Sequence, residues 1–129
     1  MKKHYVMALV VLFSMLFMSG CSNENQLKAW NMIEQGALIV DVRTPGEFKS
    51  GHLPGAKLIP INQVSARINE FGADKNKPVV VYCQSGSRSG KAENILKQNG
   101  FTNVHNGGGY SALMSAKADF EKSKENKPL

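Results

Sequence analysis

The chain has 129 residues, a formal net charge of +6 and 42% hydrophobic residues, which suffices for one domain with a modest core. Its lysines and arginines are scattered and form no basic block interleaved with aromatic residues. This distribution argues against a nucleic-acid-binding protein, and it favours only a mild attraction for small anions.

Residues 1–20 have the composition of an export signal. Two lysines give a positive start, and the apolar run 6–18 is too short for a membrane-spanning helix. The segment ends in Met18-Ser19-Gly20-Cys21, which resembles the lipobox of bacterial lipoproteins. This resemblance implies cleavage after Gly20, a lipid on Cys21 and a domain held at the cell membrane or envelope, outside the cytoplasm. An ordinary signal peptide and an uncleaved membrane anchor are the alternatives.

The rest of the chain predicts strands that alternate with helices. Residues 21–26 indicate a short tether, 27–120 one domain and 121–129 a polar tail. Strands are expected at 37–40, 58–59, 79–82 and 101–105, and helices at 27–35, after Thr44, at 64–71, at 89–99 and from Tyr110, with the glycine run 106–109 flexible and the chain fraying from Lys117. Such alternation is typical of an α/β domain with a mainly parallel sheet.

Cys83 stands between the predicted strand 79–82 and the predicted helix 89–99, in a loop of small and polar residues that contains Arg88. Unpaired N–H groups at a helix N-terminus, together with this arginine, favour a thiolate, which is the nucleophilic form of cysteine. The loop looks too small to shield the sulfur. If Cys21 carries a lipid, Cys83 has no disulfide partner. The alternative is that Cys83 is only a small buried side chain at a strand end.

Two motifs resemble the signatures of the rhodanese family. The first is Asp41-Val42-Arg43, followed by Glu47-Phe48 and Gly51-His52-Leu53-Pro54-Gly55-Ala56, and the second is Val79-Val80-Val81-Tyr82-Cys83 with Gly86 and Arg88. Gly107-Gly108 looks like the family's late glycine pair, so the resemblance covers about residues 26–120. It implies a rhodanese-like α/β fold and similarity to the small single-domain rhodaneses of bacteria.

The resemblance implies a sulfurtransferase that needs no metal or organic cofactor. Cys83 would take a sulfane sulfur from a small anionic donor such as thiosulfate, hold it as a persulfide and pass it to a thiol or cyanide. Arg88 would hold the anionic donor or brace the loop, and Asp41 and Arg43 would form a supporting pair. A monomer is expected. The implied substrate-binding loop consists of Gln84, Ser85, Gly86, Ser87, Arg88 and Ser89.

Two further residues of the first motif have structural roles in this interpretation. Glu47 is expected to complete a capping box with Thr44, at the start of the short helix. His52 lies in a turn rich in glycine and proline, and we expect it to bond the backbone there.

A reactive cysteine loop also occurs in proteins with three other functions. Phosphatases and arsenate reductases of the wider fold use a cysteine loop in which five residues separate the cysteine from the arginine. Four residues separate Cys83 from Arg88, and the tighter ring suits a sulfur atom better than a tetrahedral oxyanion. A thiol–disulfide oxidoreductase would need a resolving cysteine, and the sequence has no Cys-x-x-Cys motif. A non-catalytic persulfide carrier, or a module that presents its sulfur to a partner, stays open as the alternative.

Overall fold

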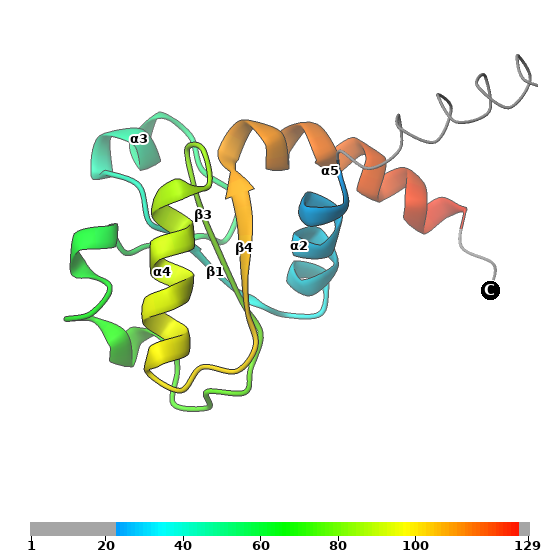
Figure 1. Cartoon of the computed structure of the whole chain (residues 1–129). Helices are drawn as coiled ribbons and strands as arrows, with labels where there is room; N and C mark the ends of the chain where they lie inside the picture. Colours follow the sequence, from blue (N-terminus) through cyan, green and yellow to red (C-terminus); the bar gives the residue numbers. More distant parts are fainter. Residues whose placement is uncertain (1–22, 127–129) are drawn as a thin grey trace, which may run out of the picture.

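The computed structural model describes residues 23–126, which alternate between helices and strands (Figure 1). The elements in chain order are α2 (Glu24–Glu34), β1 (Leu38–Asp41), α3 (Pro45–Ser50), β2 (Lys57–Leu58), the 3₁₀ turns η2 (Ile61–Gln63) and η3 (Ile68–Phe71), β3 (Val79–Cys83), α4 (Ser87–Gln98), β4 (Val104–Gly109) and α5 (Tyr110–Glu125). In the described part of the chain, no helix has the length and apolar character needed to cross a membrane.

The four strands form one sheet in the order β2-β1-β3-β4, and all three pairings are parallel. The α/β class and the parallel sheet are therefore confirmed. Every residue of β3 is buried, as expected for a central parallel strand that is covered on both faces. The carboxyl ends of β1 and β3 lie side by side, because Asp41 pairs with Tyr82. Ligands of open parallel sheets bind at this edge.

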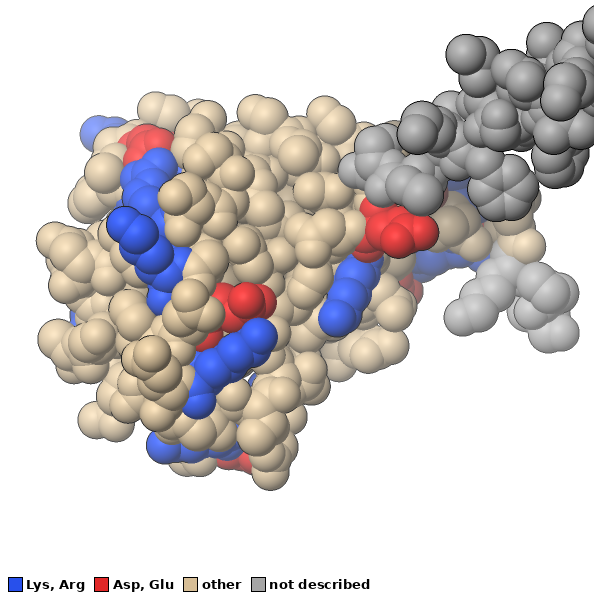
Figure 2. All heavy atoms as spheres, viewed as in Figure 1, with Lys and Arg blue, Asp and Glu red and all other residues tan. Residues whose placement is uncertain are grey.

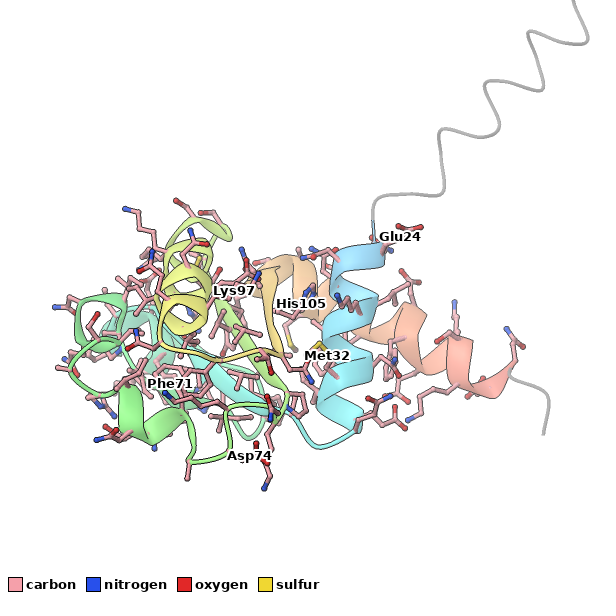
Figure 3. All side chains as sticks on the ribbon, turned by 60° about the horizontal axis from the view of Figure 1, so that its bottom comes forward. Glu24, Met32, Phe71, Asp74, Lys97 and His105 are labelled. Atoms are coloured by element: carbon pink, nitrogen blue, oxygen red, sulfur yellow. The ribbon has the colours of Figure 1, made fainter. Side chains whose placement is uncertain are left out.

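The side chains of β3 alternate between two cores. Val80 and Tyr82 belong to the core beneath α2 and α5, whereas Val79, Val81 and Cys83 belong to the core beneath α4 and the 3₁₀ turns. In Figure 3, the labelled Met32 of α2 and Phe71 of η3 lie on opposite sides of the sheet. This alternation places Cys83 on the same face as α4.

The helix predicted at 64–71 does not form. The segment is instead built from turns, in which most backbone bonds run from residue i to i−3, as from Glu70 N–H to the carbonyl of Arg67 at 2.9 Å. The tighter 3₁₀ geometry still buries Val64 and Phe71. The spacing of the apolar residues therefore predicted correctly that Val64 and Phe71 are buried. It did not distinguish an α-helix from 3₁₀ turns.

Both ends of the domain are more ordered than the sequence indicates. Helix α2 begins at Glu24, inside the segment predicted as a tether, and α5 continues to Glu125, although fraying was expected from Lys117. Phe120 fixes this part of α5 because its ring is buried and stacks against Trp30, with 6.5 Å between ring centroids. The prediction of fraying from Lys117 relied on the polar composition of this segment and did not consider Phe120.

The glycine run 106–109 is part of strand β4 and is not a flexible link. The expected strand began at Phe101, whereas β4 begins at Val104. At Gly107 an added Cβ would come within 3.2 Å of a methyl group of Val80 and 3.4 Å of the Cβ of Ala29 in helix α2. Helix α2 can therefore pack this close to β4 only because the strand has glycine at this position.

Candidate active site

Cys83 is the last residue of β3, and α4 begins four residues later at Ser87. Gly86 connects them with φ at +96°, a left-handed conformation that favours glycine. An added Cβ there would also meet the backbone of Gly108 at 3.4 Å. This turn aims the Gly86 N–H at the Cys83 Sγ, with 2.9 Å between nitrogen and sulfur.

Hydrogen-bond donors surround the Cys83 sulfur. The Ser89 Oγ lies 3.4 Å from Sγ, in addition to the Gly86 N–H. Burial raises the pKa of the Cys83 thiol, but the Ser89 hydroxyl and the backbone N–H groups of Ser89, Ser85 and Gly86 lower it by more. The pKa therefore lies below its ordinary value, and the site favours a thiolate.

The expectation that the loop leaves Cys83 unshielded is wrong. Cys83 is 0% exposed, because it packs in the core with Val42 and with Ala92 of α4. The sulfur therefore has no solvent-exposed surface in this conformation. The alternative that Cys83 is only a small buried side chain at a strand end therefore describes its packing correctly. It does not account for the hydrogen bonds that the sulfur accepts.

Arg88 is paired with Glu47 of α3. Its two terminal nitrogens lie 2.7 and 3.0 Å from the two carboxylate oxygens of Glu47. The Arg88 hydrogen bond, followed by the bond from the Thr44 N–H, lowers the pKa of Glu47 to about 2. The expected capping box between Thr44 and Glu47 is confirmed. Of the two roles expected for Arg88, this pair favours bracing of the loop.

Asp41 and Arg43 form a buried ion pair at the end of β1, with 2.7 Å between Nη2 and Oδ2. The same guanidinium donates to the carbonyl of Gly51 at 2.6 Å and to the side chain of Gln84 at 3.2 Å. It also lies over the ring of Tyr110, 4.6 Å from its centroid. The pair thus joins β1, the end of α3, the cysteine loop and the start of α5.

One residue that the structure brings to the site was not predicted from the sequence. Asn106 of β4 accepts a hydrogen bond from the Ser89 hydroxyl at 2.7 Å and donates one to the carbonyl of Gly86 at 3.0 Å. A polar residue directly before a run of glycines was the only available hint. His52, in contrast, bonds the carbonyl of Phe48 at 2.8 Å, so its expected backbone role is confirmed.

A cleft of about 500 Å³ lies beside the cysteine loop, and Arg43, Gln84 and Tyr110 contribute to its wall. A larger hollow of about 730 Å³ lies at the other end of the strands, where β1 and β3 begin, and none of its lining residues is a cysteine or histidine. The smaller cleft is the candidate site because it lies at the carboxyl edge of the sheet, beside the loop that follows Cys83. Within residues 23–126, no three acidic, histidine or cysteine side chains are grouped as a metal site. On the face shown in Figure 2, basic and acidic side chains lie beside one another without a continuous basic patch.

The chain is similar in sequence to known proteins. The family model described as a rhodanese-like domain matches residues 25–116. The chain is 41% identical over 78 residues to the thiosulfate sulfurtransferase PspE of Escherichia coli, a match that covers 60% of this chain and 75% of PspE. It is 47% identical over 70 residues to YqhL of Bacillus subtilis, and it spans about half of that protein's length, 54%.

Two solved structures are similar at the level of the fold. A rhodanese with anions from Escherichia coli has a TM-score of 0.57 and 41% identity, covering 59% of this chain and 89% of its own. A rhodanese-like domain protein from Staphylococcus aureus has a TM-score of 0.54 and 39% identity, covering 60% and 74%. With the family model matching most of the described domain, the chain belongs to the rhodanese family.

Proposed function

We propose that the chain is a sulfurtransferase that carries sulfane sulfur as a persulfide on Cys83. The observation that supports this most is the Gly86 N–H directed at the Cys83 sulfur from the N-terminus of α4. This donor, with the partial positive charge of the helix terminus, stabilises a sulfur anion at that position. The name of the relative PspE, a thiosulfate sulfurtransferase, supports the same reaction class.

The reaction proceeds in two displacements. The Cys83 thiolate attacks the outer sulfur of thiosulfate, the S–S bond of the donor breaks, and sulfite leaves with the electron pair. Cys83 then bears a persulfide, whose terminal sulfur is attacked by a thiolate or cyanide. The bond between the two sulfurs breaks and returns the electron pair to Cys83 as thiolate, so no external oxidant or reductant is consumed.

Substitution of the nucleophile tests this function. Cys83→Ser should abolish thiosulfate:cyanide transfer with unchanged far-UV circular dichroism, because a serine hydroxyl does not ionise in this site. The wild type should show ping-pong kinetics, since sulfite leaves before the acceptor binds. Substantial transfer by a folded Cys83→Ser variant would rule out the assignment.

A persulfide carrier is the second candidate. It is favoured by the burial of Cys83 and by a 38% identical Bacillus subtilis relative named a putative sulfur carrier protein, of which the match covers 36%. A carrier would take up one sulfur per chain and release it slowly to small acceptors. Repeated turnover with cyanide or a small thiol decides for the enzyme.

We also propose that the domain lies on the outer side of a cell membrane, anchored by a lipid on Cys21. Its support is the Met18-Ser19-Gly20-Cys21 sequence, which lies outside the described residues. Cys21 is three residues from the start of α2, a span of at most about 11 Å. Since Asn25 of α2 bonds the backbone of Asn106, an anchor there would keep the catalytic edge near the membrane. Unchanged processing and membrane association in Cys21→Ser would contradict the anchor.

A further inference from the structure

The Ser89 hydroxyl lies between two acceptors. Ser89 is fully buried on α4, and its Oγ is 2.7 Å from Asn106 Oδ1 and 3.4 Å from Cys83 Sγ. A hydroxyl has a single proton, so it can donate to only one of them at a time. Both acceptors lie within hydrogen-bond distance of this single donor, so they share its one proton.

The backbone fixes which end of the Asn106 amide faces Ser89. The carbonyl of Gly86, which can only accept, lies 3.0 Å from Nδ2, and the N–H of Gly108, which can only donate, lies 2.9 Å from Oδ1. A flipped amide would face both groups with the wrong atom. The amide oxygen therefore faces Ser89 and has no proton of its own to offer.

We propose that Asn106 and the Cys83 sulfur compete for the Ser89 proton, so that Asn106 is a positioning residue that controls the nucleophilicity of Cys83 through Ser89. This inference rests on the proposed role of Cys83 as the nucleophile. While Ser89 donates to Asn106, its lone pairs face the sulfur and suit a thiol that donates its S–H. When the proton turns to the sulfur, it joins the Gly86 N–H in stabilising the thiolate.

The charged groups around this cluster are held by other partners. Arg88 is bound to Glu47, and Arg43 to Asp41. The Glu93 carboxylate accepts the backbone N–H of Asn106 at 3.0 Å, and His105 contacts the backbone of α2. Substitution of the Asn106 amide therefore leaves each of these charges with a partner. The charged residues on the elements around the cluster are Asp41 of β1, Arg43 after it, Glu47 of α3, and Arg88 and Glu93 of α4, whereas His105 of β4 bonds the backbone of Asn25 on α2.

A double-mutant cycle tests the competition. The rate of Cys83 alkylation by iodoacetamide is measured against pH in the full chain, with peptide mass spectrometry to count Cys83 separately from Cys21. Asn106→Leu should lower the midpoint pH by about half a unit to one unit, the size expected for release of one hydrogen bond. The same substitution in the Ser89→Ala background should leave the midpoint unchanged. The midpoint is compared, and not the rate alone, because a thiolate with lower pKa is intrinsically less nucleophilic.

Asn25→Ala is the matched control, because it removes a 3.0 Å bond to the Asn106 carbonyl and leaves the Asn106 side chain in place. Its midpoint should equal that of the wild type. An equal shift in Asn25→Ala, or an equal effect of Asn106→Leu with and without Ser89, would overturn the competition. If Asn106→Leu does not fold, Asn106→Asp replaces it and should raise the pH midpoint of Cys83 alkylation. The increase should be larger with Ser89 present than in the Ser89→Ala background. A lower midpoint in Asn106→Asp would overturn the competition. Sulfur transfer is assayed separately, so loss of the proposed function would be seen independently of this coupling.

Discussion

The ion pair between Glu47 and Arg88 distinguishes two roles for Arg88. Glu47→Gln removes the charge of Glu47 but keeps a residue that can complete the capping box with Thr44. If Arg88 braces the cysteine loop, the substitution should lower kcat/KM for thiosulfate. If Arg88 instead binds the anionic donor, freeing it from Glu47 should lower KM.

The expected magnitude follows from the geometry. Both side chains are about one-third exposed, 32% for Arg88 and 30% for Glu47. The fall in the Glu47 pKa from 4.5 to about 2 would nominally correspond to about 3 kcal/mol, but solvent screening at this exposure reduces the contribution to about 1 kcal/mol. If this energy holds the loop in place, its loss lowers kcat/KM by up to about fivefold.

Acid dependence provides the second measurement. Because the Glu47 pKa is lowered in the folded state, its stabilisation is present above the unfolded pKa near 4.5 and is lost as pH falls to about 2. The stability difference between wild type and Glu47→Gln should therefore be constant at neutral pH and disappear over that window. Urea unfolding at several pH values measures it.

Glu70→Gln is the control for this prediction, because Glu70 also has a pKa lowered to about 2, by Arg67 and then by Lys57, at a site away from the cysteine loop. It should leave sulfur transfer unchanged. An unchanged kcat/KM in Glu47→Gln, or an equal loss in Glu70→Gln, would refute the bracing role.

Further substitutions and one insertion test other parts of the structure. Arg43→Met leaves the buried Asp41 carboxylate unpaired and should cost about 3–5 kcal/mol in chemical unfolding, and a cost below 1 kcal/mol would show that the pair is dispensable. Gly107→Ala should destabilise the domain by about 1–3 kcal/mol because of its 3.2 Å contact, whereas Gly46→Ala, with 4.0 Å of clearance, should be neutral or slightly stabilising, and equal melting temperatures would contradict this. One glycine inserted after Gly86 should lower sulfur transfer and improve competitive inhibition by phosphate and arsenate, and tight phosphate binding by the unaltered loop would remove loop length as the discriminator.

The order of strands and helices and the position of Cys83 were predictable because they depend on local patterns. A run of apolar residues from Val79 marks the central strand, and the small residues after Cys83 mark its loop. Thr44 and Glu47 form their capping box within three residues, so the sequence predicted that too. Such features need no knowledge of what packs against them.

Contacts between distant segments were not predictable. Arg88 and Glu47 are 41 positions apart in the sequence and form an ion pair. Ser89 and Asn106 are 17 positions apart and form a hydrogen bond. Each contact depends on how β1, β3 and β4 are placed in the sheet. The burial of Cys83 has the same origin, since the residues that cover it come from different elements. The polar composition after Lys117 likewise gave a wrong prediction of fraying, because Phe120 packs on Trp30, a residue of the distant helix α2.

The most direct test of the account is the mass of the protein after incubation with thiosulfate. Cys83 should gain one sulfur atom, located by peptide mass spectrometry, and cyanide should remove it with release of an equal amount of thiocyanate. Cys83→Ser should gain none. A wild-type chain that gains no sulfur on Cys83, or a variant that gains as much as the wild type, would contradict the persulfide mechanism.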